Sequence, residues 1–110
     1  MIEVPVGVLA AGEDPLKTAK RELEEETGYV GKKWTYLGKT VESSAKLTNY
    51  MFIYLVEDCE KASGQKLDYG EDIEVIEVSL NEAVEMIMNN EIICDSSIGA
   101  ILKLARIKGL

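Results

Sequence analysis

Apolar and polar residues follow one another along this chain in patterns that predict three strands. Tyr50 to Val56 (YMFIYLV) is almost continuously apolar and aromatic, as is typical of a central strand. Trp34 to Leu37 is a second candidate, and Ile73 to Val78 alternates apolar with acidic residues like a half-buried strand. Residues 39–48 are polar and residues 57–72 are rich in charge and glycine, so both predict loops.

Three helices are expected from apolar residues at helical spacing. The first runs from Pro15 to Thr27, because Asp14 suits an N-cap, proline suits the first helical position, and Gly28 suits the end. A short amphipathic segment over 81–89 and a last one over 96–107 follow it.

Length and composition restrict what such a chain can be. With 110 residues, we expect one domain spanning residues 1–110. Lys and Arg number 12 against 20 Asp and Glu, and the net charge of −8 disfavours nucleic-acid binding. No apolar run approaches the roughly 18 residues of a membrane span, and the first residues lack the basic region of a signal peptide. We therefore expect a cytoplasmic protein that binds neither nucleic acid nor membrane.

The available side chains limit the chemistry. There is no histidine, and the two cysteines, Cys59 and Cys94, are far apart, so a zinc site, a histidine-based triad or a disulfide framework is not expected. Acid–base chemistry then depends on carboxylates, lysine or tyrosine. The surplus of carboxylates favours a hard divalent cation as partner.

The first predicted helix places three carboxylates on one face. At about 100° per residue, Glu22, Glu25 and Glu26 lie within about 100° of arc, beside an apolar stripe. Like charges at this spacing destabilise a helix by about 0.2–0.5 kcal/mol per pair, and acids in the last turn face the negative end of the helix dipole. A bound divalent cation would reverse both effects. The helix alone leaves two interpretations open, a cation site and a solvated acidic face.

The spacing around this helix is more specific. Gly7 is followed by five residues and Glu13, and Glu13 by seven residues and Arg21, which opens the run RELEEETGY ending at Tyr29. This pattern resembles the Nudix box (Gly, five, Glu, seven, Arg-Glu-apolar-any-Glu-Glu-any-Gly-apolar) at every defined position. The similarity extends over essentially the whole chain.

The resemblance implies a role for each matching residue. In the Nudix family the box forms a loop, a helix and a loop that bind Mg²⁺ or Mn²⁺ and hold a diphosphate for hydrolysis. Glu22 and Glu26 would be the principal metal ligands, with Glu25 ligating the metal or assisting catalysis. Arg21 would fix a box carboxylate through an ion pair, and Glu13 would tie the loop to the helix.

The segments on either side of the box resemble the ADP-ribose pyrophosphatase subfamily. Residues 3–7 (EVPVG) are similar to the Glu-x-Pro-Ala-Gly of that group, in which the carbonyl before the glycine contacts the metal; here this carbonyl would belong to Val6. Residues 67–75 (LDYGEDIEV) resemble a downstream loop whose glutamate ligates metal or activates water, and Glu71 is the expected residue. The alternatives are Asp68, Asp72, or a charged surface loop without a role.

The resemblance also implies a fold, a reaction and an assembly. The family fold is an α/β/α sandwich around a mixed sheet, of the α+β class, with strands that precede the box. Here the chain begins six residues before Gly7, so an N-terminally truncated domain is expected. The reaction would be Mg²⁺- or Mn²⁺-dependent hydrolysis of a small-molecule nucleotide, most directly ADP-ribose to AMP and ribose 5-phosphate, by a homodimer. The alternatives are another nucleotide substrate, a catalytically inactive Nudix domain acting as a binding or assembly module, and an acidic domain with no site.

Overall fold

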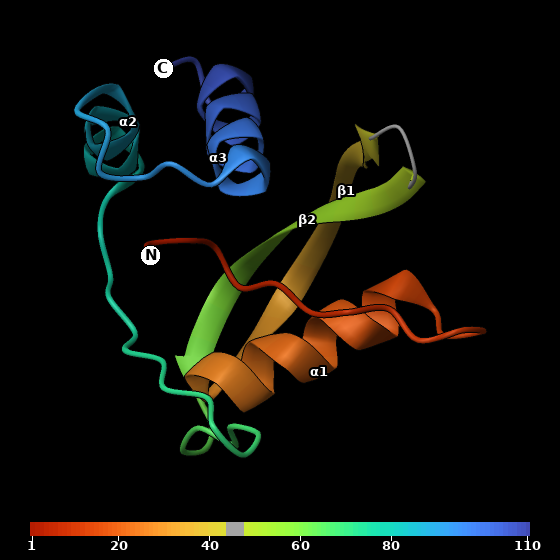
Figure 1. The fold of residues 1–110 in the computed structure, drawn as a ribbon. Helices are drawn as coiled ribbons and strands as arrows, with labels where there is room; N and C mark the ends of the chain where they lie inside the picture. The colour runs from red at the N-terminus through yellow and green to blue at the C-terminus, as the bar shows by residue number, and fades with distance from the viewer. Residues whose placement is uncertain (44–47) are drawn as a thin grey trace. The chain divides into compact units, whose positions relative to one another are not determined.

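The computed structural model describes residues 1–43 and 48–110, which form three helices and one pair of strands (Figure 1). The helices are α1 (Pro15–Thr27), α2 (Leu80–Met88) and α3 (Asp95–Ile107), and the strands are β1 (Tyr29–Ser43) and β2 (Thr48–Lys61). The α+β class is therefore confirmed. Contacts divide the chain into two compact units, one of residues 5–75 and one of residues 1–4 with 76–110. A single domain over residues 1–110 stays a prediction.

α1 begins and ends where the sequence predicts. Asp14 precedes it with an extended backbone, and Pro15 occupies the first turn, although the Asp14 side chain makes no capping bond. At the other end, Gly28 has a φ of +79° and donates its N–H to the carbonyl of Glu24 at 2.8 Å. A Cβ on Gly28 would collide with the carbonyl oxygen of Ser63. Both the backbone angle and this close approach therefore require glycine.

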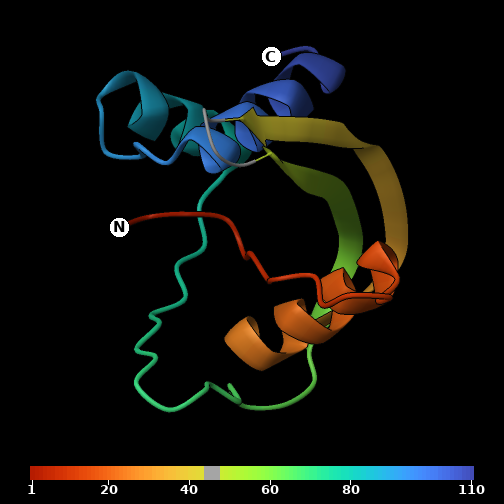
Figure 2. The ribbon, with the colours of Figure 1, turned by 45° about the vertical axis from the view of Figure 1, so that its right-hand side comes forward.

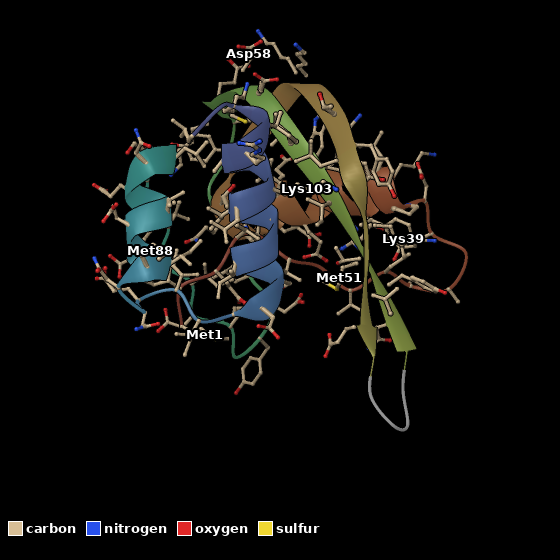
Figure 3. The ribbon with its side chains drawn as sticks, turned by 90° about the horizontal axis from the view of Figure 1, so that it is seen from above. Met1, Lys39, Met51, Asp58, Met88 and Lys103 are labelled. Atoms are coloured by element: carbon tan, nitrogen blue, oxygen red, sulfur yellow. The ribbon has the colours of Figure 1, made fainter. Side chains whose placement is uncertain are left out.

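β1 and β2 pair as a long antiparallel hairpin that curves beside α1 (Figure 2). The register runs from Tyr29 opposite Lys61 to Ser43 opposite Thr48, with one irregularity just after Tyr36. In the part of the chain that the structure describes, this antiparallel pair is the whole sheet, where the family fold implies a mixed one. Figure 3 shows the side chains of the two strands.

The strand boundaries differ from the prediction. Both apolar segments expected as strands lie inside β1 and β2. The loops predicted over 39–48 and 57–72 are wrong at the ends next to these segments, because the residues there belong to the strands. β1 continues to Ser43 and β2 continues to Lys61, because each strand supplies the other with backbone hydrogen bonds along its length. The rest of the first predicted loop, residues 44–47, lies outside the described residues.

The strand predicted at Ile73–Val78 is wrong. The segment forms neither helix nor strand, and Val75, Ile76 and Val78 are 40%, 50% and 42% exposed. A strand is held by pairing with a neighbour, and no described strand pairs with this segment. The alternation of apolar and polar side chains therefore indicates a tendency to form a strand. It does not supply the neighbouring strand with which such a segment must pair.

The buried apolar side chains belong to the unit of α2 and α3. Both helices lie within one residue of their predicted bounds, and Ser79 caps α2 by accepting the N–H of Glu82 at 3.1 Å. Ser97, fully buried, accepts the N–H of Val4 at 3.0 Å. The core consists of Ala83, Ile87, Ile92 and Ala105.

None of the described helices could span a membrane, because none combines the length and the apolar character that this requires.

The unit of residues 5–75 has a different kind of interior. None of its described apolar side chains is buried, and the buried polar residues there are Thr18 and Thr27. Tyr36, Tyr50 and Phe52 on the hairpin are 53%, 55% and 37% exposed. Lys39, labelled in Figure 3, lies over the Tyr50 ring at 4.5 Å. Backbone pairing and hydrogen bonds, more than a closed apolar core, hold this unit together.

We expect Gly28→Ala to lower the free energy of unfolding more than Gly12→Ala. The two glycines have φ values of +79° and +80°, where an alanine costs about 1–2 kcal/mol. A Cβ on Gly12 meets nothing within 4 Å, whereas one on Gly28 meets the Ser63 carbonyl. Chemical denaturation measures both variants against the unchanged protein. Equal losses would show that Ser63 does not press against the end of α1.

Candidate active site

Arg21 joins three carboxylates on α1 and the loop before it. Its Nη1 donates to Glu22 Oε1 at 3.1 Å and to Glu25 Oε2 at 3.3 Å, and its Nη2 lies 3.5 Å from Glu13 Oε2. The planar guanidinium presents several donors at once, so one side chain reaches carboxylates on either side. Arg21 thereby offsets part of the repulsion among these acids.

Glu13 fixes the loop that leads into α1. Its Oε1 accepts the N–H of Ala10 at 2.8 Å, and its Oε2 accepts the hydroxyl of Thr18, a buried residue, at 3.1 Å. These bonds, the one from Ala10 first among them, lower the pKa of Glu13 below its usual value. Glu13 thus ties the loop to the helix, as the resemblance implies.

The segment before the box lies against the acidic face of α1. Glu26 Oε2 accepts the N–H of Val6 at 3.3 Å. Gly7 approaches the Glu22 side chain so closely that a Cβ there would collide with it. The missing side chain at Gly7 lets the backbone pass the helix, and this brings Val6 next to Glu26.

The loop after β2 is anchored to the C-terminal end of α1. Lys66 donates its N–H to the carbonyl of Glu25 at 2.7 Å. The side-chain amide of Gln65 donates to the carbonyls of Glu26 and Ile73, both at 2.8 Å. Carbonyls in the last turn of a helix lack partners within the helix, so these donors satisfy them. Sequence reasoning missed Gln65, because a glutamine in a charged loop carries no distinctive signal.

Glu71 turns back into its own loop. Its Oε1 accepts the N–H of Asp68, and its own N–H donates to the Asp68 carbonyl at 3.0 Å. Asp68 is the loop acid whose charge acts on Glu22, where it helps to raise the pKa of that carboxyl. The negative charge of Asp68 therefore acts on a carboxylate of the box, that of Glu22. The catalytic role of Glu71 stays a prediction.

Glu22 is the box acid most affected by its surroundings. Partial burial is the main cause that raises its pKa above the usual value, the charges of Glu25 and Asp68 add to this, and Arg21 opposes it. The ionised form of Glu22 is therefore disfavoured in the folded chain. A divalent cation would favour it.

The donor chemistry of this site suits a hard divalent cation. Carboxylate and carbonyl oxygens are the ligands that Mg²⁺ and Mn²⁺ prefer. Within residues 1–43 and 48–110, no three acidic or cysteine side chains are gathered as a metal-binding cluster. The acids are instead paired with Arg21 and with the N–H of Val6. The assigned metal ligands stay predictions: Glu22, Glu25, Glu26 and the Val6 carbonyl.

Comparison with known proteins identifies the class. A family model described as the NUDIX domain matches residues 1–93, which include α1, the hairpin and α2. The chain therefore belongs to the Nudix family, as its box indicates.

Two curated relatives are similar to this chain over most of its length. The chain is 37% identical over 93 residues to the ADP-ribose pyrophosphatase of Bacillus subtilis (strain 168), a match covering 84% of this chain and 50% of that protein. It is 33% identical over 102 residues to the methanol dehydrogenase activator of Bacillus methanolicus, covering 92% and 55%. The chain thus spans about half the length of the curated relatives it matches.

We expect Mg²⁺ to lower the raised pKa of Glu22. Because the folded chain holds this proton more tightly than the unfolded chain, Glu22 favours folding at acid pH, and that contribution is lost as the pH rises through its folded pKa. NMR titration of side-chain carboxyl carbons measures the pKa with and without Mg²⁺, and Glu22→Gln identifies the resonance. An unchanged pKa at millimolar Mg²⁺ would show that Glu22 is no ligand.

We expect Gln65→Leu to loosen the loop from α1. The substitution removes both hydrogen bonds of the side-chain amide, so exchange of the Lys66 N–H with solvent should accelerate about tenfold, the loss of roughly one such bond. Hydrogen exchange followed by NMR measures this rate, and Gln65→Glu, which keeps the shape but has no N–H to donate to the two carbonyls, should accelerate the exchange as well. If Lys66 exchanges at the original rate, Gln65 does not hold the loop.

Proposed function

We propose that this chain hydrolyses a nucleoside diphosphate linked to another moiety, and that ADP-ribose is the substrate. The observation that carries the proposal is the arrangement on α1, where Arg21 fixes Glu22 and Glu25 while Glu26 contacts Val6. Box acids and the preceding segment therefore lie together. The similarity to the ADP-ribose pyrophosphatase of Bacillus subtilis supports the choice of substrate.

In this proposal Glu22, Glu26 and the Val6 carbonyl hold Mg²⁺ or Mn²⁺, with Glu25 as a further ligand or assistant. The ion, when bound, neutralises diphosphate oxygens and makes a nucleophile available near neutral pH. Arg21 orients the carboxylates through the contacts described above. All of the proposed ligands belong to α1 or to the segment before it.

The loop of residues 62–75 supplies the proton acceptor. Glu71 is the expected base for the attacking water, and Asp68, whose charge acts on Glu22, is the alternative on the same loop. Water attacks one phosphorus, the bond from that phosphorus to the bridging oxygen breaks, and AMP and ribose 5-phosphate leave. Anchoring by Gln65 and Lys66 keeps this loop at the end of α1.

Location and assembly belong to the same proposal. The resemblance to the ADP-ribose pyrophosphatase subfamily implies a cytoplasmic protein. It also implies that the protein forms a homodimer and binds a small-molecule nucleotide. The exposed aromatic side chains of the hairpin support a partner at that surface.

We expect release of AMP from ADP-ribose in the presence of Mg²⁺ or Mn²⁺, and its loss in Glu26→Gln. Substitution of a residue that merely orients a metal ligand typically lowers activity by about 10- to 100-fold. Removal of a ligand should therefore lower the rate of AMP release by about a hundredfold or more. Glu85→Gln, the same change on an exposed position of α2, should leave the rate unaltered. Chromatographic assay of AMP measures all three proteins. No release with either metal would contradict the proposal.

A Nudix domain that binds without catalysis is the second candidate. One observation favours it: a relative of similar coverage is named a methanol dehydrogenase activator. Such a module would bind Mg²⁺, measurable by calorimetry, without releasing AMP. Binding without turnover supports this candidate, and turnover rejects it.

A further inference from the structure

The hydroxyl of Thr18 is buried near the start of α1 and bonds to a side chain outside the helix. Thr18 is 5% exposed, and its hydroxyl donates to Glu13 Oε2 at 3.1 Å. A threonine inside a helix commonly donates instead to a carbonyl of the preceding turn. Thr27, which is also buried on α1, does this, because its hydroxyl donates to the carbonyl of Leu23 at 2.6 Å. Thr18 therefore departs from the local pattern in favour of Glu13.

The carboxylate that Thr18 holds lies between the loop and the box. Glu13 Oε2 accepts the hydroxyl of Thr18 and also lies 3.5 Å from Arg21 Nη2. The Arg21 side chain is long and 45% exposed, so its direction depends on the partners that it meets. The hydroxyl, in contrast, belongs to a short, buried and β-branched side chain, which has little conformational freedom. Thr18 thus fixes the oxygen that faces Arg21.

Arg21 extends this constraint to the acidic face of α1. Its Nη1 donates to Glu22 Oε1 at 3.1 Å and to Glu25 Oε2 at 3.3 Å. Because the guanidinium is rigid and planar, a shift of Nη2 at Glu13 also moves Nη1. The hydroxyl of Thr18 is therefore linked to both box carboxylates through Glu13 and Arg21.

We propose that Thr18 is a positioning residue of the candidate site. Its hydroxyl orients Glu13 and, through Glu13, Arg21. Arg21 in turn keeps Glu22 and Glu25 in the arrangement that receives Mg²⁺ or Mn²⁺. Thr18 is one of the seven residues between Glu13 and Arg21, which the box pattern leaves undefined. The inference rests on the proposed function, because that proposal assigns these carboxylates to the metal.

The pKa of Glu13 in metal-free protein tests the bond itself. Thr18→Val, which keeps the shape but has no hydroxyl, should raise the lowered pKa of Glu13 towards its usual value, because the bond favours the ionised carboxylate. Thr27→Val is the matched control, since it removes a buried hydroxyl of the same helix that bonds to a backbone carbonyl. It should leave the pKa of Glu13 unchanged, and so should Thr18→Ser, which keeps a hydroxyl. NMR titration of side-chain carboxyl carbons measures these values.

Metal binding tests the consequence of the bond. Calorimetry should show that Thr18→Val binds Mg²⁺ about tenfold more weakly than the unchanged protein, the lower end of the effect of losing a residue that orients metal ligands. Thr27→Val and Thr18→Ser should bind Mg²⁺ normally. In the assay of AMP release, Thr18→Val should need more Mg²⁺ to reach half of its maximal rate, while its KM for ADP-ribose stays unchanged.

Three results would overturn the inference. They are an unchanged pKa of Glu13 in Thr18→Val, an unchanged Mg²⁺ affinity of this variant, and equal weakening by Thr27→Val, which marks a general loosening of α1. The assay of AMP release separates this inference from the proposed function. Release with a Mg²⁺ affinity that does not depend on Thr18 rejects the inference only. A Mg²⁺ affinity that depends on Thr18, without release, supports the inference while rejecting turnover.

Discussion

The crowding of negative charge on one short helix is the constraint on which the rest of this site depends. Glu22, Glu25 and Glu26 repel one another and lie at the unfavourable end of the helix dipole. The guanidinium of Arg21 and the backbone N–H of Val6 offset part of this repulsion. A bound divalent cation, as in the proposed function, would offset the repulsion that remains.

The C-terminal end of α1 organises a second part of the molecule. Its last carbonyls have no partners in the helix, and the chain returns from β2 to supply donors to them. Lys66 and Gln65 bind the carbonyls of Glu25 and Glu26, residues whose side chains belong to the box. The same two residues therefore hold the downstream loop with their backbone, while the proposed function assigns their side chains to the metal site. A change in that loop and a change in the box are consequently coupled through very few bonds.

The sequence predicted what depends on local signals and not what depends on distant partners. Asp14, Pro15 and Gly28 define α1 within a few residues, and the spacing of the box is enough to place its acids on that helix. The extension of the hairpin to Lys61 and the unpaired segment after Ile73 depend on which strands meet, and alternation carries no such information. The contacts of Gln65 and the inward turn of Glu71 are missed for the same reason, since each depends on a backbone group elsewhere in the fold.

The absence of buried apolar side chains among the described residues of the hairpin unit has a thermodynamic consequence. Unfolding raises the heat capacity in proportion to the apolar surface that becomes hydrated, and exposure of polar groups lowers it. The apolar side chains of this unit, such as Trp34, Ile53 and Leu55, are only partly buried, so each of them exposes less new apolar surface on unfolding than a core side chain does. The heat-capacity increment per apolar side chain should accordingly be smaller for this unit than for the helical unit, which has the apolar core.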